Sequence, residues 1–494
     1  MSIFDNTRNH YATFLLILHI TPKTMDTTEL AERIFFNLPY TPTDQQVEVL
    51  AALAQFCSAD MPSDSAFLLG GYAGTGKTSL MGALVKALKE INIPVVLMAP
   101  TGRAAKVFGK FAGGFASTIH RRIYRPPSPG ENYGFVSVAE NNMHNAVFIV
   151  DEASMIADNA TEGRSSLLDD LVYYVYSGEG CRMILLGDTA QLPPVGSLES
   201  PAMSVTSLKK LGLKVFHATM TQTVRQAADS GILYNATWLR RAMRQKELPE
   251  PVLHVSRFPD VAVVEAEDLE DSIASSYSNA GAEGTIIVTR SNRRAAAYNM
   301  SIRTKILDRE EELCRDERLM IAKNNYLWSA KIKGLDFIAN GDIAVVSRII
   351  STETRYGLRW ADVELTLPDR DISLTCKIML DTLLSEGPAL APARMEQLAQ
   401  DILSDPEVFT PSTPMPTRLK MLRSDPFFNA LQVKYAYAIT CHKSQGGQWE
   451  EVYVDMGFIP PEMRGIDYYR WLYTATTRAT SKLYYVNPAG VKVK

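Results

Sequence analysis

Cysteine is scarce in this chain of 494 residues, and it never occurs as a closely spaced pair. The cysteines are widely scattered, at Cys57, Cys181, Cys314, Cys376 and Cys441. This spacing argues against a disulfide framework and against a Cys-x-x-Cys zinc site. It predicts reduced thiols and a cytoplasmic location.

Long apolar runs are also missing. The best candidate, residues 11–20 (YATFLLILHI), is too short to span a bilayer, so no membrane association is expected. The residues after it do not provide the small-residue cleavage site of a signal peptide. A polar helix start follows at Met25. We therefore predict that residues 1–26 are an N-terminal extension, of which 1–24 either precede the true start or form a disordered tail.

Charge of one sign is not in excess. Lys and Arg number 51 and Asp and Glu 55, which gives a formal net charge of −4. A protein that binds nucleic acid needs a basic path rather than a basic total, so this balance neither indicates nor excludes such a partner. The hydrophobic fraction of 46% is that of an ordinary globular protein, and the length predicts about two to four domains.

Apolar runs that alternate with helical periodicity predict α/β lobes with parallel sheets. The first lobe is predicted over 27–228, with strands at 66–71, 94–100, 145–152 and 182–188 and a helix at 79–91. A Pro- and Gly-containing insert at about 120–144 predicts a small β-hairpin. The second lobe is predicted to be discontinuous, over 229–303 and 430–494, with a β module and a helical segment inserted at 304–429.

The run from Gly71 to Thr78 fits the pattern G-x-x-x-x-G-K-[ST] between a predicted strand and a predicted helix. Its glycines would let backbone N–H groups surround phosphates, and the helix N-terminus would favour the negative charge. Lys77 would reach the β- and γ-phosphates, and Thr78 would ligate Mg²⁺. The motif therefore predicts an ATP site made of Gly71, Gly74, Thr75, Gly76, Lys77, Thr78 and Ser79.

Two further strand ends carry candidate catalytic groups. Asp151 and Glu152 follow an apolar strand; Asp151 would hold the metal and Glu152 would orient and deprotonate the attacking water. An acidic helix N-terminus would also account for this pair. Gln191, within Gly187–Pro194, could sense the γ-phosphate or the water, although a simple strand-end turn would also account for that run.

In this order the motifs resemble those of superfamily 1 DNA helicases, most closely the RecD/Dda-like branch, from about residue 41 onward. The resemblance implies two RecA-like lobes, with the 304–429 insert SH3-like. It implies that Gln46, rather than its neighbour, reads the adenine edge and that Gly446 lets backbone approach the nucleotide. It also implies that Arg225 reaches the γ-phosphate and that Arg478 is an arginine finger supplied by the second lobe.

The same resemblance implies a path for single-stranded DNA across both lobes. Residues 99–106, 116–120 and 437–446 resemble the family's DNA-contact motifs, and would supply Pro100, Thr101, Arg103, Thr118, His120, Thr440, His442, Lys443 and Ser444. The predicted hairpin resembles a strand-separating pin. Tyr133 and Phe135 flank its turn, where they would either stack on the first base pair or pack the hairpin onto the lobe.

The function expected from these features is an ATP- and Mg²⁺-dependent DNA helicase. It would move 5′ to 3′ on single-stranded DNA, open single/double-strand junctions, act in repair or recombination, and work as a monomer, with protein partners left open. One alternative is an ATPase stimulated by RNA, since both strands offer phosphates and base faces. A non-catalytic DNA-binding subunit is disfavoured by the intact ATPase motifs, and a helicase–nuclease by the lack of an additional acidic cluster.

Overall fold

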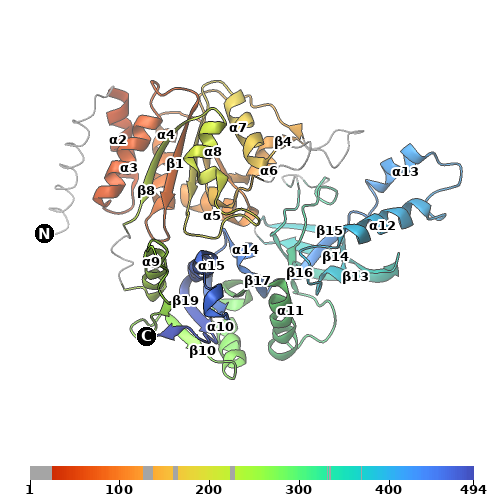
Figure 1. Ribbon diagram of the computed structural model, residues 1–494. Coiled ribbons are helices and arrows are strands. Elements are labelled where there is room, and N and C mark those ends of the chain that lie inside the picture. Colours follow the sequence, from red (N-terminus) through yellow and green to blue (C-terminus); the bar gives the residue numbers. More distant parts are fainter. Residues whose placement is uncertain are drawn as a thin grey trace.

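Two parallel sheets and one closed barrel organise the chain (Figure 1). The computed structural model describes residues 25–125, 137–158, 165–222, 229–330, 332, 335, 337–368 and 370–494. Within these ranges, no helix is both long and apolar enough to cross a membrane.

The first lobe is built on a six-stranded parallel sheet in the order β3-β2-β6-β7-β1-β8. Its strands are β1 (Ser65–Gly71), β2 (Val95–Ala99), β3 (Ala116–Thr118), β6 (Val147–Val150), β7 (Arg182–Gly187) and β8 (Lys214–Met220). Its helices are α2 (Met25–Asn37), α3 (Asp44–Phe56), α4 (Lys77–Glu90), α5 (Gly102–Ala112), α6 (Ile119–Ile123), α7 (Leu167–Ser177) and α8 (Val205–Lys210).

Helices cover both faces of this sheet, which explains why its central strands are apolar throughout. Successive side chains of a strand point to opposite faces. Phe67 and Leu69 of β1 therefore join one core with α2, α3, α4 and α5. Ala66 and Leu68 join a second core with α6, α7 and α8. Hydrophobic cores on both faces therefore stabilise the sheet. The predicted site residues lie at the carboxyl ends of its strands.

The second lobe is built on a five-stranded parallel sheet in the order β10-β19-β18-β11-β17. Its strands are β10 (Val261–Val264), β11 (Thr285–Thr289), β17 (Ala438–Thr440), β18 (Trp449–Asp455) and β19 (Ala479–Val486). Its helices are α9 (Gly231–Met243), α10 (Leu269–Gly284), α11 (Asn292–Ser301), α14 (Cys441–Ser444) and α15 (Ile466–Thr476). The chain end is tied to this lobe, where β20 (Lys492–Val493) pairs with β9 (Val252–Leu253).

A closed barrel interrupts the second lobe. It consists of β12 (Arg318–Ile321), β13 (Ile343–Arg355), β14 (Leu358–Leu367), β15 (Ile372–Met379) and β16 (Leu431–Tyr435). Between its last two strands the chain forms α12 (Pro392–Ser404) and α13 (Met415–Leu422), which project away from both lobes (Figure 1).

The α/β fold with parallel sheets is as the apolar runs predict, and each of the predicted first-lobe strands has a counterpart in the sheet. The boundary predicted at 429/430 precedes β16, which closes the barrel by pairing with β12 and β15. The SH3-like assignment of this insert stays a prediction. In the predicted hairpin, β4 (Tyr124–Arg125) pairs antiparallel with β5 (Ser137–Val138), while its turn lies outside the described residues.

Candidate nucleotide site and nucleic-acid cleft

The phosphate-binding loop joins the end of β1 to the start of α4. Gly74 (φ 75°) and Gly76 (φ 83°) adopt the left-handed conformation that glycine tolerates best. At Gly76 a Cβ would also lie only 2.6 Å from both Gln46 Nε2 and the hydroxyl of Tyr40. Glycine is thus required here for its backbone conformation and for the close approach of a neighbouring helix.

Lys77 is the first residue of α4, and its side chain folds back over the loop. Its Nζ donates to the carbonyl of Gly71 at 2.5 Å and to that of Tyr72 at 3.0 Å. Thr78 and Ser79 follow in the first helical turn and line the same cavity. The loop amides, the ammonium group and the helix N-terminus together form the arrangement that binds a polyphosphate.

Gln46 supports this loop from behind. It is 1% exposed, its Oε1 accepts from the Thr43 amide, and its Nε2 donates to the Thr75 carbonyl at 2.9 Å. Its Nε2 also donates to the Tyr40 hydroxyl at 3.2 Å. Gln45 is turned elsewhere: its Nε2 donates to the Thr219 carbonyl near the end of β8, and its Oε1 accepts from the Thr221 amide. The structure therefore shows Gln46 as a brace of the P-loop, and its contact with adenine stays a prediction.

Asp151 and Glu152 follow β6, which is separated from β1 in the sheet by β7. The Glu152 amide donates to Asp151 Oδ1 at 2.8 Å. Glu152 has a φ of 52°, a left-handed conformation that is uncommon for a residue with a Cβ and costs conformational energy. Strained residues of this kind concentrate at functional sites. Both carboxylates line the cavity that Lys77 lines.

The electrostatics at Asp151 favour a cation. Burial and the neighbouring Glu152 raise the pKa of Asp151 well above its usual range, and Lys77 opposes this only partly. Mg²⁺ takes oxygen ligands and is commonly shared between one or two side chains, water and substrate phosphates. Asp151 and Thr78 fit that role. Within the described ranges no group of three or more His, Cys, Asp or Glu residues that could hold a metal ion occurs.

Asp151→Asn is expected to raise the melting temperature of the nucleotide-free chain in EDTA at about pH 8. The raised pKa means that folding binds a proton, so Asp151 destabilises the fold progressively as pH rises from about 4 through its folded-state pKa. Near pH 4 the carboxyl is neutral and the advantage of the variant should disappear. Thermal unfolding at both pH values measures this. The exposed Asp158→Asn is the control, and an advantage that does not change with pH would contradict the assignment.

Gln191 lies on the loop after β7, beside the same cavity. The residue is 7% exposed, and its buried Oε1 has no hydrogen-bond partner among the described residues. A buried acceptor without a partner is costly, so it marks a place where a donor is expected. A nucleophilic water would provide that donor, and the role of Gln191 at the γ-phosphate or the water stays a prediction.

Arg478 reaches this cavity from the second lobe. Lys77, Asp151, Glu152, Gln191 and Arg478 all line one space of about 410 Å³ between the lobes. Arg478 is 3% exposed, and its guanidinium donates to the carbonyls of Thr474 and Gly447 at 2.9 and 3.1 Å. The lysine and the arginine predicted to share a triphosphate are thus brought together. Arg225 lies outside the described residues.

Gly446 also lines this cavity, at a point of close contact between the lobes. It has a φ of 70°, and a Cβ on it would lie 2.9 Å from the Ala104 Cβ and 3.2 Å from Thr101 Oγ1. Glycine is therefore needed at this position for its conformation and for the contact with the first lobe.

A second, more open cavity of about 450 Å³ separates the first lobe from the barrel insert. Pro100, Thr118 and His120 line it from the first lobe, and Lys323, Asn324, Tyr326, Phe337 and Asn340 from the insert. Aromatic rings bridge it, with centroids 5.4 Å apart for Tyr326–Phe337 and 6.4 Å for His120–Phe337. Burial lowers the pKa of the His120 side chain.

Not every predicted DNA-contact side chain faces this cleft. Thr101 caps α5 by accepting from the Ala104 amide at 3.2 Å. Arg103 instead bridges the lobes, since it donates to the Gln448 carbonyl at 2.7 Å and its Cζ lies 3.8 Å from the Trp449 ring centroid.

The contact segment at 437–446 is likewise divided. Ser444 is fully buried and donates to the Cys441 carbonyl, so its hydroxyl does not reach the surface. His442 is exposed, and Lys443 donates to the side chain of Asn340 at the edge of the cleft. Thr440, half-buried, lines a small adjoining pocket together with Lys443. Tyr133 and Phe135 lie outside the described residues.

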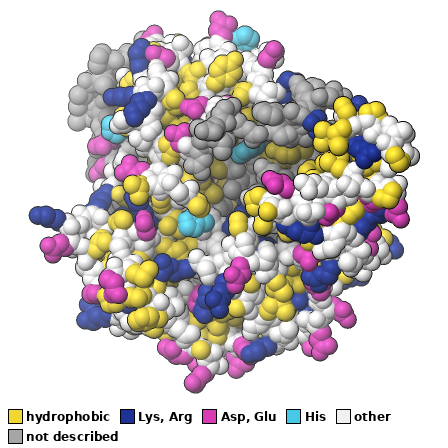
Figure 2. Space-filling view, turned by 45° about the vertical axis from the view of Figure 1, so that its right-hand side comes forward, with side chains coloured by type: hydrophobic (Ala, Val, Ile, Leu, Met, Phe, Trp, Pro, Cys, Tyr) yellow, Lys and Arg dark blue, Asp and Glu magenta, His cyan; other side chains and the backbone are white. Residues whose placement is uncertain are grey.

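Figure 2 shows acidic and basic side chains interspersed over the face drawn, rather than gathered into one basic patch. This agrees with the near-neutral net charge. The aromatic rings of the cleft and its few polar groups are therefore the more specific indication of a nucleic-acid path.

Comparison with known proteins identifies the two halves of this site. Residues 43–249 match the AAA domain, and residues 435–486 match the UvrD-like helicase C-terminal domain. This combination of an AAA domain and a UvrD-like helicase C-terminal domain is consistent with the superfamily 1 helicases. The chain is 33% identical to the ATP-dependent RecD2 DNA helicase of Deinococcus radiodurans over 175 residues, which are 34% of this chain and 21% of that protein. It is 32% identical to the ATP-dependent DNA helicase dda of phage T4 over 137 residues, 27% of this chain and 29% of that protein.

The match to these two relatives thus covers less than a third of their length. Uncharacterized protein R530 of Acanthamoeba polyphaga mimivirus is 23% identical over 481 residues, which are 84% of this chain and 94% of that protein. Among solved structures, the Pif1 helicase from Bacteroides in complex with ADP-AlF3 and ssDNA matches with a TM-score of 0.45 and 14% identity, over 90% of this chain and 92% of that one.

The candidate site also contains residues that the sequence motifs did not indicate. Tyr40 contacts the P-loop brace, and Tyr473 of α15 contacts the P-loop itself. Tyr326 and Phe337 line the cleft from the barrel insert. None of them stands in a motif that names its role. In the sequence Tyr473 is simply the last residue of an apolar run before Arg478, and its hydroxyl is the one signal that a polar partner is needed.

Proposed function

We propose that this chain is an ATP-driven motor that moves 5′ to 3′ along single-stranded DNA and unwinds duplex, in DNA repair or recombination. The observation that carries the proposal is the single cavity lined by Lys77 and Glu152 from the first lobe and by Arg478 from the second. A site split between two lobes responds to their movement, which is what a motor requires.

Each residue of the cavity has a distinct task on the substrate ATP. Lys77 and the P-loop amides hold the phosphates, and Arg478 stabilises the charge that develops as the γ-phosphoryl group leaves. Glu152 takes the proton of the attacking water, and Gln191 accepts from that water through its free Oε1. Thr78 and Asp151 would hold Mg²⁺, which neutralises phosphate charge when bound.

The DNA would pass through the cleft between the first lobe and the barrel insert. Phosphate contacts and base stacking dominate this kind of binding and give little sequence preference. The relatives RecD2 and dda are both named as DNA helicases, which supports DNA over RNA as the strand. Tyr133 and Phe135 remain our candidates for separating the duplex.

Unwinding assays with 5′-tailed and 3′-tailed duplexes test the proposed direction. We expect ATP-dependent opening of the 5′-tailed substrate and none of the 3′-tailed one, and a requirement for a 3′ tail would overturn the polarity. Comparing ATPase stimulation by single-stranded DNA and by RNA of the same sequence tests the strand. Stronger stimulation by RNA would replace DNA in the proposal.

Tyr326→Ala is expected to weaken the binding of single-stranded DNA roughly 10- to 100-fold, because it removes a ring on which a base can stack. Fluorescence anisotropy of labelled oligo-dT measures this. The matched control is Tyr173→Ala, which removes a tyrosine that is 67% exposed on α7 and does not line the cleft. Equal affinities for the Tyr326 variant and the wild type would place the DNA elsewhere.

A further inference from the structure

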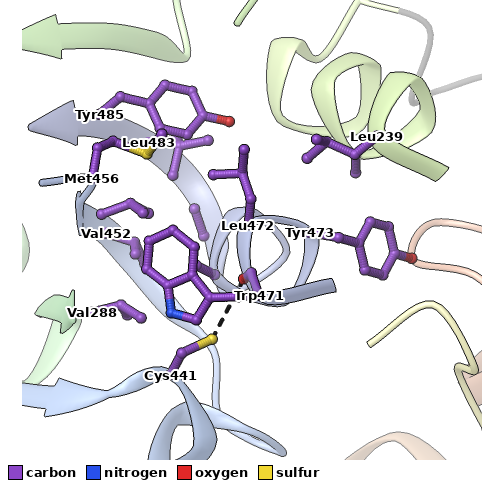
Figure 3. Packing of buried hydrophobic residues seen from close by; sticks show 14 of the residues in the cluster. Leu239, Val288, Cys441, Val452, Met456, Trp471, Leu472, Tyr473, Leu483 and Tyr485 are labelled. Carbon is purple, nitrogen blue, oxygen red and sulfur yellow. Dashed lines mark hydrogen bonds between the residues drawn. The ribbon is translucent and has the colours of Figure 1, made fainter. Parts of the chain in front are cut away.

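The loop after β7, residues 188–192, belongs to the first lobe but is held by the second. The Tyr473 hydroxyl donates to Asp188 Oδ2 at 2.5 Å, and it accepts from the Ala73 amide of the P-loop at 3.1 Å. One hydroxyl of α15 thus joins the P-loop to this loop. Figure 3 shows the Tyr473 ring pointing away from Leu472 and Leu483 and out of the second-lobe core.

The other end of the loop is held equally firmly. The Leu192 amide donates to Thr474 Oγ1 at 2.8 Å, and the Leu192 carbonyl accepts from Gln445 Nε2 at 2.7 Å. The Thr474 hydroxyl in turn donates to the Arg470 carbonyl, which fixes its orientation. The Tyr473, Thr474 and Gln445 side chains are all buried. We call these three residues the loop clamp.

Gln191 lies between the two held ends. Its backbone amide donates to the Asp188 carbonyl at 3.1 Å, while its side-chain Oε1 has no hydrogen-bond partner in the described part of the chain. Asp188 and Gln191 line both the nucleotide cavity and a further cavity of about 270 Å³. The orientation of the Gln191 side chain therefore depends on the positions of the two loop ends rather than on hydrogen bonds of its own.

The clamp is connected to the DNA side of the second lobe. Thr474 and Tyr473 follow Trp471, whose carbonyl accepts from the Cys441 thiol at 3.5 Å (Figure 3). Cys441 begins α14, which also carries His442 and Lys443, and Gln445 of the clamp follows that helix directly. A shift of α14 on binding DNA would be passed to both ends of the loop.

We propose that Tyr473, Thr474 and Gln445 are positioning residues that set the Gln191 carboxamide against the attacking water when the second lobe engages DNA. The inference rests on the proposed function, because it concerns the coupling of DNA binding to hydrolysis. It makes the second lobe contribute to hydrolysis through this loop as well as through Arg478.

Tyr473→Phe removes only the hydroxyl and tests the clamp. We expect DNA-stimulated kcat to fall roughly tenfold or more, as small misplacements of a catalytic group do. The specific readout is the ratio of the rates with and without DNA, which should fall in Tyr473→Phe. The matched control is Tyr485→Phe, whose equally buried hydroxyl bonds Thr476 at 3.0 Å within the second lobe. An equal loss in both variants, or in neither, would overturn the proposal.

Two further measurements make the test specific. In a Gln191→Ala background, Tyr473→Phe should cause no additional loss, and additive losses would show that Tyr473 does not act through Gln191. Thr474→Ser should retain the wild-type stimulation by DNA, whereas Thr474→Val should lose it.

Hydrogen exchange of the backbone amides of residues 188–192 measures how firmly the loop clamp holds this loop, independently of catalysis. The Leu192 amide should be protected in the wild type and exchange faster in Thr474→Val. No difference would overturn the clamp even if the ATPase is active. A wild type that does not hydrolyse ATP, but shows this protection, would instead refute the proposed function.

Discussion

Lys77→Ala is expected to lower the rate of DNA-stimulated ATP hydrolysis by about 1000-fold or more. Its ammonium lies over the P-loop, 2.5 Å from the Gly71 carbonyl, and faces the cavity between the lobes. Removing it takes away the only positive charge that α4 directs at the phosphates from its first turn. Phosphate release in the presence of oligo-dT measures the rate.

Lys86→Ala provides the matched control for Lys77. Lys86 is an exposed lysine on the same helix and does not line the cavity. The control should hydrolyse ATP at the wild-type rate. If both variants kept that rate, the nucleotide would not be bound at this P-loop.

Arg478→Ala is the second change with a large expected effect, a fall in kcat of about 1000-fold. ATP affinity should change far less, because the charge that Arg478 stabilises develops in the transition state. Stopped-flow binding of a fluorescent nucleotide and steady-state hydrolysis separate the two quantities. A rate within tenfold of the wild type would exclude an arginine finger at this position.

The side chain of Arg478 is buried and bonded to carbonyls of its own lobe, so stability has to be measured beside activity. Arg478→Lys keeps the charge and loses the planar fork, and it should retain more activity than the alanine variant. Lys482→Ala, an exposed cation on β19, should behave as the wild type. If these variants have equal melting temperatures, their losses of ATP hydrolysis result from the missing catalytic group and not from a destabilised fold.

The parts of the site that sequence alone predicts are those set by local chemistry. A glycine-rich loop of this pattern between an apolar strand and a helix is typical of a phosphate site, and β1, the P-loop and α4 lie where the motif requires. A pair of carboxylates at the end of an apolar strand is likewise local. Since parallel strands end at one edge of their sheet, Lys77 and Asp151 are expected at the same edge.

Contacts between distant segments cannot be predicted in this way. The sequence pattern favours the second lobe for residues 431–435, yet β16 closes the barrel, because strand pairing depends on partners far away in the chain. Ser444 resembles a DNA contact in sequence, but its side chain is fully buried. Its backbone carbonyl accepts a hydrogen bond from the Arg478 guanidinium. Tyr473 bonds an amide 400 residues away, which no local pattern signals.

A structure of the chain with a non-hydrolysable ATP analogue, Mg²⁺ and oligo-dT would test the shared cavity most directly. We expect Lys77 Nζ and the Arg478 guanidinium to lie within hydrogen-bond distance of oxygens of the same γ-phosphate, with Arg478 released from the Gly447 carbonyl. A nucleotide held by Lys77 while Arg478 kept its present bonds to Thr474 and Gly447 would contradict this.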